Sequence, residues 1–285
     1  MASSKNKARK AKEQITSAER RAKLEAARRS QDRWQRSKRI LTVVAVIVAI
    51  AIVVVVVAAI VNTNRENRNA AATSGAPSAQ ITPPDATTDG LAITLNPAAS
   101  SAPLTLDIHA DYQCPVCKDA ETRVAQGLSQ LANSNQVLVR YHIRSFLDNS
   151  LSNTSSTQAA IAATCADTVG SFQGYNAVVF ANQPAKEGTG YTDDQLRNTF
   201  ATQAGITGDN LTKFQQCYDD KATSNFVANM ESGNNSTPIP NTDDYTNGVR
   251  STPAFIINGH ELNWTQIPTD SASMLTYFQQ QANGS

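Results

Sequence analysis

The longest apolar run in the chain covers residues 40–61 and contains a single polar residue, Thr42. As a helix, this run would extend about 33 Å, which is enough to cross a hydrocarbon layer of about 30 Å. Soluble strands reach a turn signal after about 4–8 residues, and no turn signal interrupts this run. A cleaved signal peptide is the main alternative, but its apolar part is only about 7–15 residues long. We therefore expect one transmembrane helix at residues 40–61.

Polar residues dominate positions 62–88, where Ile81 is the one large aliphatic residue and Pro83-Pro84 form a pair. Polar segments that contain proline are typical of flexible linkers. We expect this linker to join the membrane span to one folded domain at residues 89–285, which is long enough for a substantial core.

Apolar and polar residues alternate within that domain in a way that predicts strands separated by helices. The strand patterns cover residues 90–95, 104–108 and 137–143, and the helical patterns cover residues 115–133, 152–246 and 270–281. A short apolar run before Asn258-Gly259, a strong turn signal, predicts a hairpin near the C-terminus. The order strand, helix, strand, several helices, hairpin and helix indicates an α/β sheet with a helical insertion at about 152–246.

Charge divides the chain into two unlike parts. Residues 1–39 hold 14 Lys or Arg against 4 Asp or Glu, whereas residues 62–285 hold 11 basic against 20 acidic residues. Basic residues beside a membrane span favour the cytoplasmic side, so we expect a basic cytoplasmic tail at 1–39 and an extracytoplasmic domain. The tail either fixes this topology or lies on anionic lipid headgroups. Nothing beyond charge indicates nucleic-acid binding, and we expect none.

Two of the four cysteines, Cys114 and Cys117, flank Pro115-Val116 where a predicted strand gives way to a helix. The N–H groups of a helix N-terminus stabilise a thiolate on the first cysteine, and the second is close enough to resolve a mixed disulfide. A zinc site is disfavoured because the chain has no second CxxC and no histidine at ligand spacing. An inert disulfide is disfavoured because it would close a tiny loop. The spacing therefore favours a redox centre.

Cys165 and Cys217 both fall in the predicted helical insertion. An even number of cysteines suits an oxidising compartment, so a structural disulfide between these two is the plain interpretation. A second redox pair and two free buried thiols are the alternatives. We interpret His109 and His142, which lie in strand patterns, as framework residues. Asp111 either tunes the Cys114 thiolate or caps the end of its strand.

Two segments carry a resemblance to the DsbA-type thioredoxin family: LTLDIHADYQCPVC at residues 104–117 and GVRSTPAFIING at residues 248–259. The family inserts a helical domain between such motifs, so the resemblance implies a thioredoxin-like fold with an inserted helical domain, preceded here by one transmembrane helix. By this resemblance, Cys114 would be the nucleophile and Cys117 the resolving cysteine. Pro253 would be a cis-proline, and Thr252 would present its backbone to a substrate peptide.

The resemblance also implies partners. A membrane-anchored member similar to those of Gram-positive and mycobacterial envelopes would oxidise the cysteine thiols of exported proteins and be reoxidised by a quinone-linked membrane partner. Val116 departs from the well-known periplasmic enzyme, which has a histidine there. It therefore keeps open a disulfide reductase or isomerase supplied by a membrane electron donor. A binding or chaperone domain without turnover is a third alternative. No nucleotide, metal or flavin motif is present, so we expect no cofactor.

Overall fold

The computed structural model of the chain describes residues 79–242 and 245–283. The predicted basic tail, the predicted membrane span at 40–61 and most of the predicted linker lie outside these residues. Within the part of the chain that is described, no helix is both long enough and apolar enough to cross a membrane.

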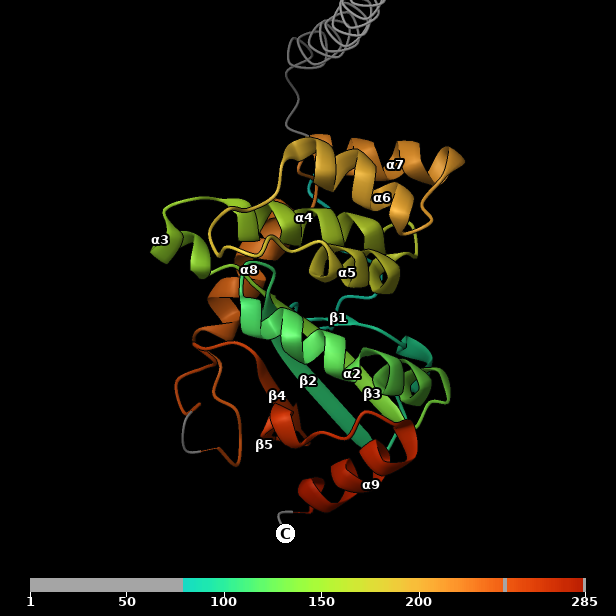
Figure 1. The fold of residues 1–285 in the computed structure, drawn as a ribbon, viewed down its shortest axis with the longest axis vertical. Helices are drawn as coiled ribbons and strands as arrows, with labels where there is room; N and C mark the ends of the chain where they lie inside the picture. The colour runs from blue at the N-terminus through green and yellow to red at the C-terminus, as the bar shows by residue number, and fades with distance from the viewer. Residues whose placement is uncertain (1–78, 243–244, 284–285) are drawn as a thin grey trace, which may run out of the picture. The chain divides into compact units, whose positions relative to one another are not determined.

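Five strands form one mixed sheet in the order β1-β3-β2-β4-β5 (Figure 1). The central strand β2 (Leu104–Asp111) runs parallel to β3 (Val137–Arg144) and antiparallel to β4 (Ala254–Ile257). The outer strands are β1 (Ile93–Thr94), antiparallel to β3, and β5 (His260–Leu262), antiparallel to β4. The two parallel strands require a crossover connection, and the helix that follows β2 provides it.

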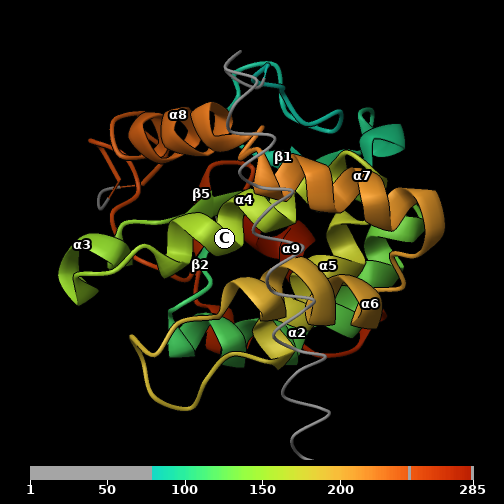
Figure 2. The ribbon, with the colours of Figure 1, turned by 90° about the horizontal axis from the view of Figure 1, so that it is seen from above.

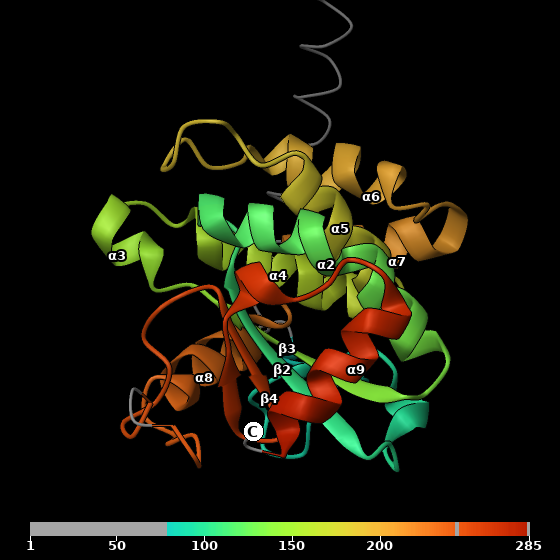
Figure 3. The same cartoon turned by 60° about the horizontal axis from the view of Figure 1, so that its bottom comes forward.

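Two helices cover one face of the sheet, α2 (Pro115–Asn133) and α9 (Ser271–Ala282) (Figure 3). Their close approach depends on Gly127, because a Cβ atom there would lie 2.7 Å from the carbonyl oxygen of Thr269 and from the Met274 side chain. The buried positions of α2 recur at helical spacing, which gives the helix one face toward the sheet.

The opposite face of the sheet is covered by α8 (Ser224–Asn234). Successive side chains of a strand point to opposite faces, and two neighbours in β3 show this directly. Tyr141 donates a hydrogen bond to Glu121 of α2, whereas the ring of His142 is hydrogen-bonded to Asn234 of α8. The sheet therefore lies between α2 and α9 on one side and α8 on the other.

The helical insertion lies between β3 and β4 in the sequence. Its helices before α8 are α3 (Leu147–Leu151), α4 (Ser155–Asp167), α5 (Phe172–Ala181), α6 (Phe200–Gln203) and α7 (Gly208–Asp219). The Ala-rich helix α4 is buried on nearly all sides and packs against α5, α7 and α8 (Figure 2). A helix that is apolar or small all round is expected at such a central position.

The α/β sheet with a helical insertion is the fold that the sequence predicted. Two residues at the end of the predicted linker, Ile81 and Asp85, are hydrogen-bonded to the folded domain. The N–H group of Ile81 donates to the carbonyl oxygen of Ala222 (2.8 Å), and that of Asp85 donates to the carboxylate of Asp167 (3.0 Å). The last residues of the predicted linker thus bind the domain through two of its buried residues.

Candidate functional site

The CxxC motif lies where β2 ends and α2 begins. Cys114 is the N-cap of α2 with an extended backbone (φ −78°, ψ 115°), and Pro115 occupies the first turn, where its missing N–H group leaves no partner unsatisfied. The carbonyl oxygen of Cys114 accepts hydrogen bonds from the N–H groups of Cys117 (3.1 Å) and Lys118 (3.3 Å). Both cysteines are free thiols, and they are only 7% and 2% exposed. The backbone N–H groups of Val116 and Cys117, at the start of the helix, are hydrogen-bonded to the sulfur of Cys114.

The two thiols differ strongly in acidity. The hydrogen bond from the Cys117 thiol, aided by the backbone N–H groups of Cys117 and Val116, lowers the pKa of Cys114 to about 6 despite burial. Burial, followed by the hydrogen bond and the charge of Cys114, raises the pKa of Cys117 well above its ordinary value. At neutral pH the site thus holds one thiolate and one protonated thiol, the arrangement that thiol exchange through a mixed disulfide requires.

The segment that precedes β4 reaches the same site. The peptide bond between Thr252 and Pro253 is cis, and the sulfur of Cys114 lies 3.6 Å from the carbonyl oxygen of Thr252. The sheet explains this approach, because Ala254 at the start of β4 pairs with His109 near the end of β2. The four residues predicted to form the redox site are therefore brought together, and the role of each stays a prediction.

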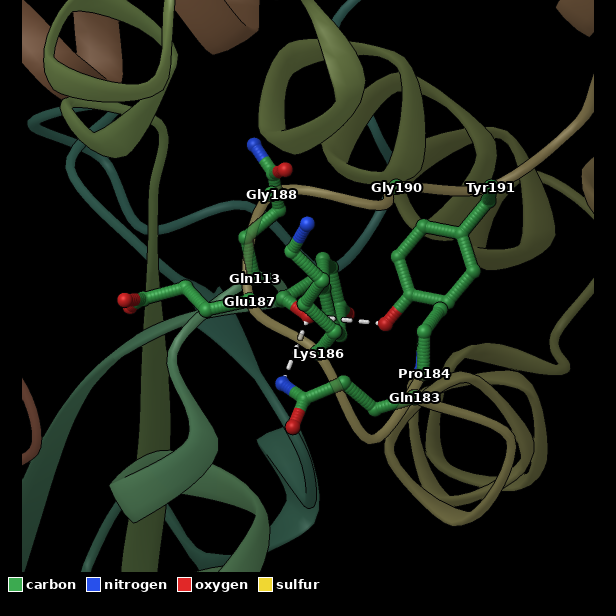
Figure 4. A pocket seen from close by; sticks show the side chains of 9 residues that line it. Gln113, Gln183, Pro184, Lys186, Glu187, Gly188, Gly190 and Tyr191 are labelled. Atoms are coloured by element: carbon green, nitrogen blue, oxygen red, sulfur yellow. Dashed lines mark hydrogen bonds between the residues drawn. The ribbon is translucent and has the colours of Figure 1, made fainter.

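A loop of the helical insertion, residues 183–191, fixes the backbone of the redox motif from the other side. The side-chain amide of Gln183 donates to the carbonyl oxygens of Tyr112 (2.8 Å) and Cys114 (2.9 Å), and the hydroxyl of Tyr191 also donates to Tyr112 (2.7 Å). Figure 4 shows the Gln183 and Tyr191 side chains pointing toward one carbonyl group beside the shallow pocket that this loop lines. Neither residue was predicted from the sequence, because a glutamine and a tyrosine in a loop form no motif.

Asp111 binds the backbone around it and does not face solvent. Its carboxylate accepts hydrogen bonds from the hydroxyl of Ser156 (2.5 Å) and from the N–H groups of Gln113 (2.9 Å) and Leu147 (3.3 Å). Burial raises the pKa of Asp111 to about 7. Of the two interpretations offered by the sequence, these contacts support the cap at the end of the strand, which also joins β2 to the insertion.

A second buried acid, Glu121, lies one turn after Cys117 on the same buried face of α2. Its carboxylate accepts hydrogen bonds from the hydroxyl of Tyr141 (3.2 Å) and the amide of Asn176 (3.2 Å). Burial raises the pKa of Glu121 to about 7, so this group titrates near neutral pH. The amphipathic pattern of the helix gave no sign of it, because a glutamate in such a pattern is normally exposed.

The two histidines of the strands lie between the sheet and α8, as expected of framework residues. His142 is hydrogen-bonded to Asp107 (2.9 Å) and Asn234 (2.8 Å). His109 stacks on His142 with ring centroids 4.1 Å apart, and neither of its ring nitrogens has a hydrogen-bond partner. Across residues 79–242 and 245–283, no group of three or more histidine, cysteine or acidic side chains is placed to hold a metal ion.

The other two cysteines, Cys165 of α4 and Cys217 of α7, form a disulfide in the structure, with Cα atoms 5.7 Å apart. They lie in the helical insertion, whereas the free pair lies at the end of the central strand. This pairing corresponds to the plain interpretation of the sequence and leaves Cys114 and Cys117 to react with each other.

A family model described as thioredoxin matches residues 98–276, which is more than half of the chain. A second family model, described as the N-terminal domain of carboxypeptidase Rv3627c-like proteins, matches residues 30–87. No curated protein sequence shows a significant match to the chain.

Solved structures show the same fold at low sequence identity. Oxidised DsbA of Mycobacterium tuberculosis superposes with a TM-score of 0.52 at 21% identity, covering 67% of this chain and 92% of that chain. MdbA from Actinomyces oris gives 0.54 at 16% identity (70% and 92% covered), and oxidised BdbD from Bacillus subtilis gives 0.52 at 16% identity (73% and 100% covered). The chain therefore belongs to the thioredoxin family, and its fold is that of the DsbA-type proteins.

Proposed function

We propose that the chain is a membrane-anchored, extracytoplasmic thiol–disulfide oxidoreductase whose Cys114–Cys117 pair donates disulfides to exported proteins. The observation that carries this proposal is the contrast between the two thiols, a pKa of about 6 for Cys114 and a raised pKa for Cys117, at the start of α2. MdbA from Actinomyces oris, which has a similar fold, is a thiol-disulfide oxidoreductase, and this supports the same chemistry here.

The reaction begins with Cys114 and Cys117 joined as a disulfide. A thiolate of the exported protein attacks the sulfur of Cys114, the Cys114–Cys117 bond breaks, and Cys117 leaves as a thiolate that takes up a proton. A second thiolate of the exported protein then attacks its own sulfur in the mixed disulfide. The substrate disulfide forms, Cys114 leaves as a thiolate, and two electrons have passed from the substrate to the pair.

The low pKa of Cys114 favours this direction. A thiol with a lower pKa leaves faster in disulfide exchange, and Cys114 is the leaving group of the second step. With a pKa of about 6, roughly nine-tenths of the reduced protein carries a Cys114 thiolate at pH 7. Because this thiolate stabilises the reduced form, the oxidised form gives up its disulfide readily.

The position of the Thr252 carbonyl beside Cys114 is evidence for a polypeptide substrate. Its oxygen lies 3.6 Å from the reactive sulfur, so a peptide joined to that sulfur would pass close to the backbone of Thr252. An extended peptide can pair with such a backbone in the manner of an added strand, which gives affinity without a specific side chain.

The proposed function also includes a membrane anchor and a membrane partner in the cell envelope. The apolar run at residues 40–61 would anchor the protein, with the basic tail in the cytoplasm and the redox domain outside. A quinone-linked membrane partner would accept the two electrons and restore the disulfide. Anchoring would keep the redox pair near that partner.

A reductase or isomerase is the second candidate, because of Val116. Val116 lies directly before Cys117 and is 45% exposed. Because its side chain is apolar, it carries no charge that would stabilise a thiolate. A pair without that stabilisation would hold its disulfide more firmly and would need a membrane electron donor.

The reduction potential of Cys114–Cys117 decides between the two candidates. The protein is equilibrated in glutathione buffers, and the reduced fraction is counted by thiol-specific mass labelling. A potential well above about −200 mV supports a disulfide donor, whereas a value near about −270 mV, as in thioredoxin, supports the reductase.

A cellular test separates both candidates from a domain that binds proteins without turnover. Cys114→Ser should abolish disulfide formation in exported proteins, while Cys117→Ser should accumulate mixed disulfides with them. If cells carrying Cys114→Ser form these disulfides normally and also lose no disulfide reduction or isomerisation, the protein acts as a binding or chaperone domain.

A further inference from the structure

Arg144, the last residue of β3, has a fully buried guanidinium group. It forms a bidentate ion pair with Glu231 of α8 (3.1 Å for each contact) and donates to the side-chain oxygen of Asn235 (2.7 Å). It also donates a 2.6 Å hydrogen bond to the backbone carbonyl of Val249 and lies 5.5 Å from the centroid of the Phe146 ring. Three of its partners thus come from two segments that are far away in the sequence.

The contact with Val249 fastens the chain just before Thr252 to the end of α8. The N–H group of Val249 donates to the carbonyl oxygen of Asn234 (2.9 Å), so both backbone groups of this residue are held. Gly248 makes the approach possible, because a Cβ atom there would lie 2.5 Å from the backbone of Asn235 and its φ is +89°. The backbone before Thr252 is therefore pressed onto α8 with no room for a side chain.

These contacts fix both ends of a short segment, residues 250–253, which we call the Thr252 segment. At one end Val249 is held by Arg144 and α8, and at the other Ala254 is held by β2 within the sheet. Between them the carbonyl of Thr252 faces the sulfur of Cys114. A shift of Val249 would be transmitted to this carbonyl, since only two residues separate them.

We propose that Arg144 is a positioning residue for polypeptide substrates, which holds the Thr252 segment in place through Val249 and so aligns an extended peptide with Cys114. The inference rests on the proposed function, because it concerns how that site recognises its substrate.

Stability alone does not explain a buried arginine. Replacing a buried ion pair with apolar residues of similar volume often leaves a protein equally stable or makes it more stable. A guanidinium group, however, offers several donors in a fixed planar arrangement, so it can hold Glu231, Asn235 and Val249 in one geometry. The geometry it fixes is that of the backbone leading to Thr252.

The role of Arg144 is tested by comparing the reaction of a peptide thiol with that of a small thiol. A small thiol such as glutathione needs access to the sulfur of Cys114, whereas a peptide also needs the backbone of Thr252. We therefore measure the second-order rate constants with which a reduced cysteine peptide and glutathione each reduce the oxidised full-length protein in detergent, and we take the peptide-to-glutathione ratio. A defect in thiol chemistry or in folding lowers both values, but loss of positioning lowers their ratio.

Gly248→Ala tests the contact without removing a charge. Its Cβ atom displaces Val249 from α8, and we expect the peptide-to-glutathione ratio to fall at least tenfold. Gly205→Ala is the matched control, since Gly205 also has a positive φ (+78°) but nothing lies within 4 Å of its Cβ position. The control should keep the ratio of the wild type within twofold.

Arg144→Lys is the second variant, and it decides the matter if Gly248→Ala fails to fold. Lysine keeps the charge but cannot make the bidentate contact and reach Val249 together, so the ratio should again fall at least tenfold. Arg197→Lys is its control, because Arg197 forms a similar bidentate pair with Asp219 in the helical insertion.

The outcomes separate this inference from the proposed function. If wild-type protein oxidises neither the peptide nor glutathione, the proposed function fails. If wild-type protein is active and both test variants keep its ratio, or lose the two activities in equal measure, the positioning role of Arg144 is wrong while the oxidoreductase stands.

Discussion

Replacing Cys165 and Cys217 together with alanine should lower the free energy of unfolding by about 5 kcal/mol. This disulfide joins α4 to α7 across a sequence separation of 52 residues, and both cysteines are buried. It spans the helical insertion, whereas the free thiols of the redox site lie at the end of β2. The structure therefore assigns it to holding the insertion together.

The magnitude follows from the length of the closed loop. In the chain-entropy model a loop of about 52 residues reduces the entropy of the unfolded chain by about 14 cal/mol/K, or about 4 kcal/mol at 25 °C. Loss of two buried sulfur atoms adds a cavity cost of about 1 kcal/mol. Together these terms are a large fraction of the roughly 5–15 kcal/mol by which a typical domain is stable.

Urea unfolding of residues 77–285, followed by circular dichroism, measures this loss. The protein that keeps Cys165 and Cys217 and the protein that lacks them should both carry Cys114→Ala and Cys117→Ala, so that Cys165–Cys217 is the disulfide under test. A loss below about 1 kcal/mol would refute the loop-closure argument. In a second measurement, Cys165→Ala/Cys217→Ala with the redox pair intact should keep the wild-type reduction potential, and a shifted potential would indicate an electron relay between the pairs.

Three further substitutions test buried groups through unfolding free energies. Glu121→Gln should stabilise the domain by up to about 3 kcal/mol at pH 8 and little at pH 4. The pKa of Glu121 is raised from 4.5 to about 7 in the folded protein. The contribution of Glu121 to stability is therefore full below pH 4.5 and is lost as the pH rises through 7. Equal effects at both pH values would contradict this. His109→Phe should stabilise the domain by about 1–3 kcal/mol at pH 7, since the ring nitrogens of His109 are buried and unpaired. The gain should be larger at pH 5. Burial lowers the pKa of His109, so the wild-type domain becomes less stable as the pH falls below 6.5. A destabilised variant would show that His109 has a partner in solution. Gln183→Leu should cost about 1–3 kcal/mol because it leaves two buried carbonyl groups without this donor, whereas exposed Gln203→Leu should cost little.

Local patterns predicted the part of the site that lies at the ends of secondary-structure elements. Alternation at residues 104–108 and the helical pattern at 115–133 correspond to β2 and to α2, so the CxxC motif falls at their junction as expected. The chemistry of a helix N-terminus then follows from the sequence alone. The place of Thr252 at the redox site was implied by the resemblance and not by any local pattern, and the pairing of β2 with β4 that brings it to Cys114 was not predicted.

The side chains that hold the backbone of the site in place, which we call its supports, are Gln183, Tyr191 and Arg144. They could not be predicted, because they join residues that are far apart in the sequence. Gln183 lies 71 residues after the carbonyl of Tyr112 that it binds, and Arg144 lies 105 residues before that of Val249. A polar residue at the end of a strand or in a loop is usually solvated, so neither position differs from an ordinary surface residue in the sequence. Only the packing of the insertion against the sheet gives these side chains their partners.

The two supports act on different halves of the site, and this separates its chemistry from its selectivity. Gln183 and Tyr191 hold the backbone that carries the Cys114 thiolate, whereas Arg144 holds the backbone that leads to Thr252. Gln183→Leu should therefore alter the pKa of the Cys114 thiol and the reactions of every thiol substrate, while Arg144→Lys should change the preference for peptides. If both supports served stability alone, the two variants would lower all activities in proportion to the unfolded fraction. A change of preference in one variant and of thiol acidity in the other would show that the 183–191 loop and the contacts between Arg144 and α8 act on different steps of the same reaction.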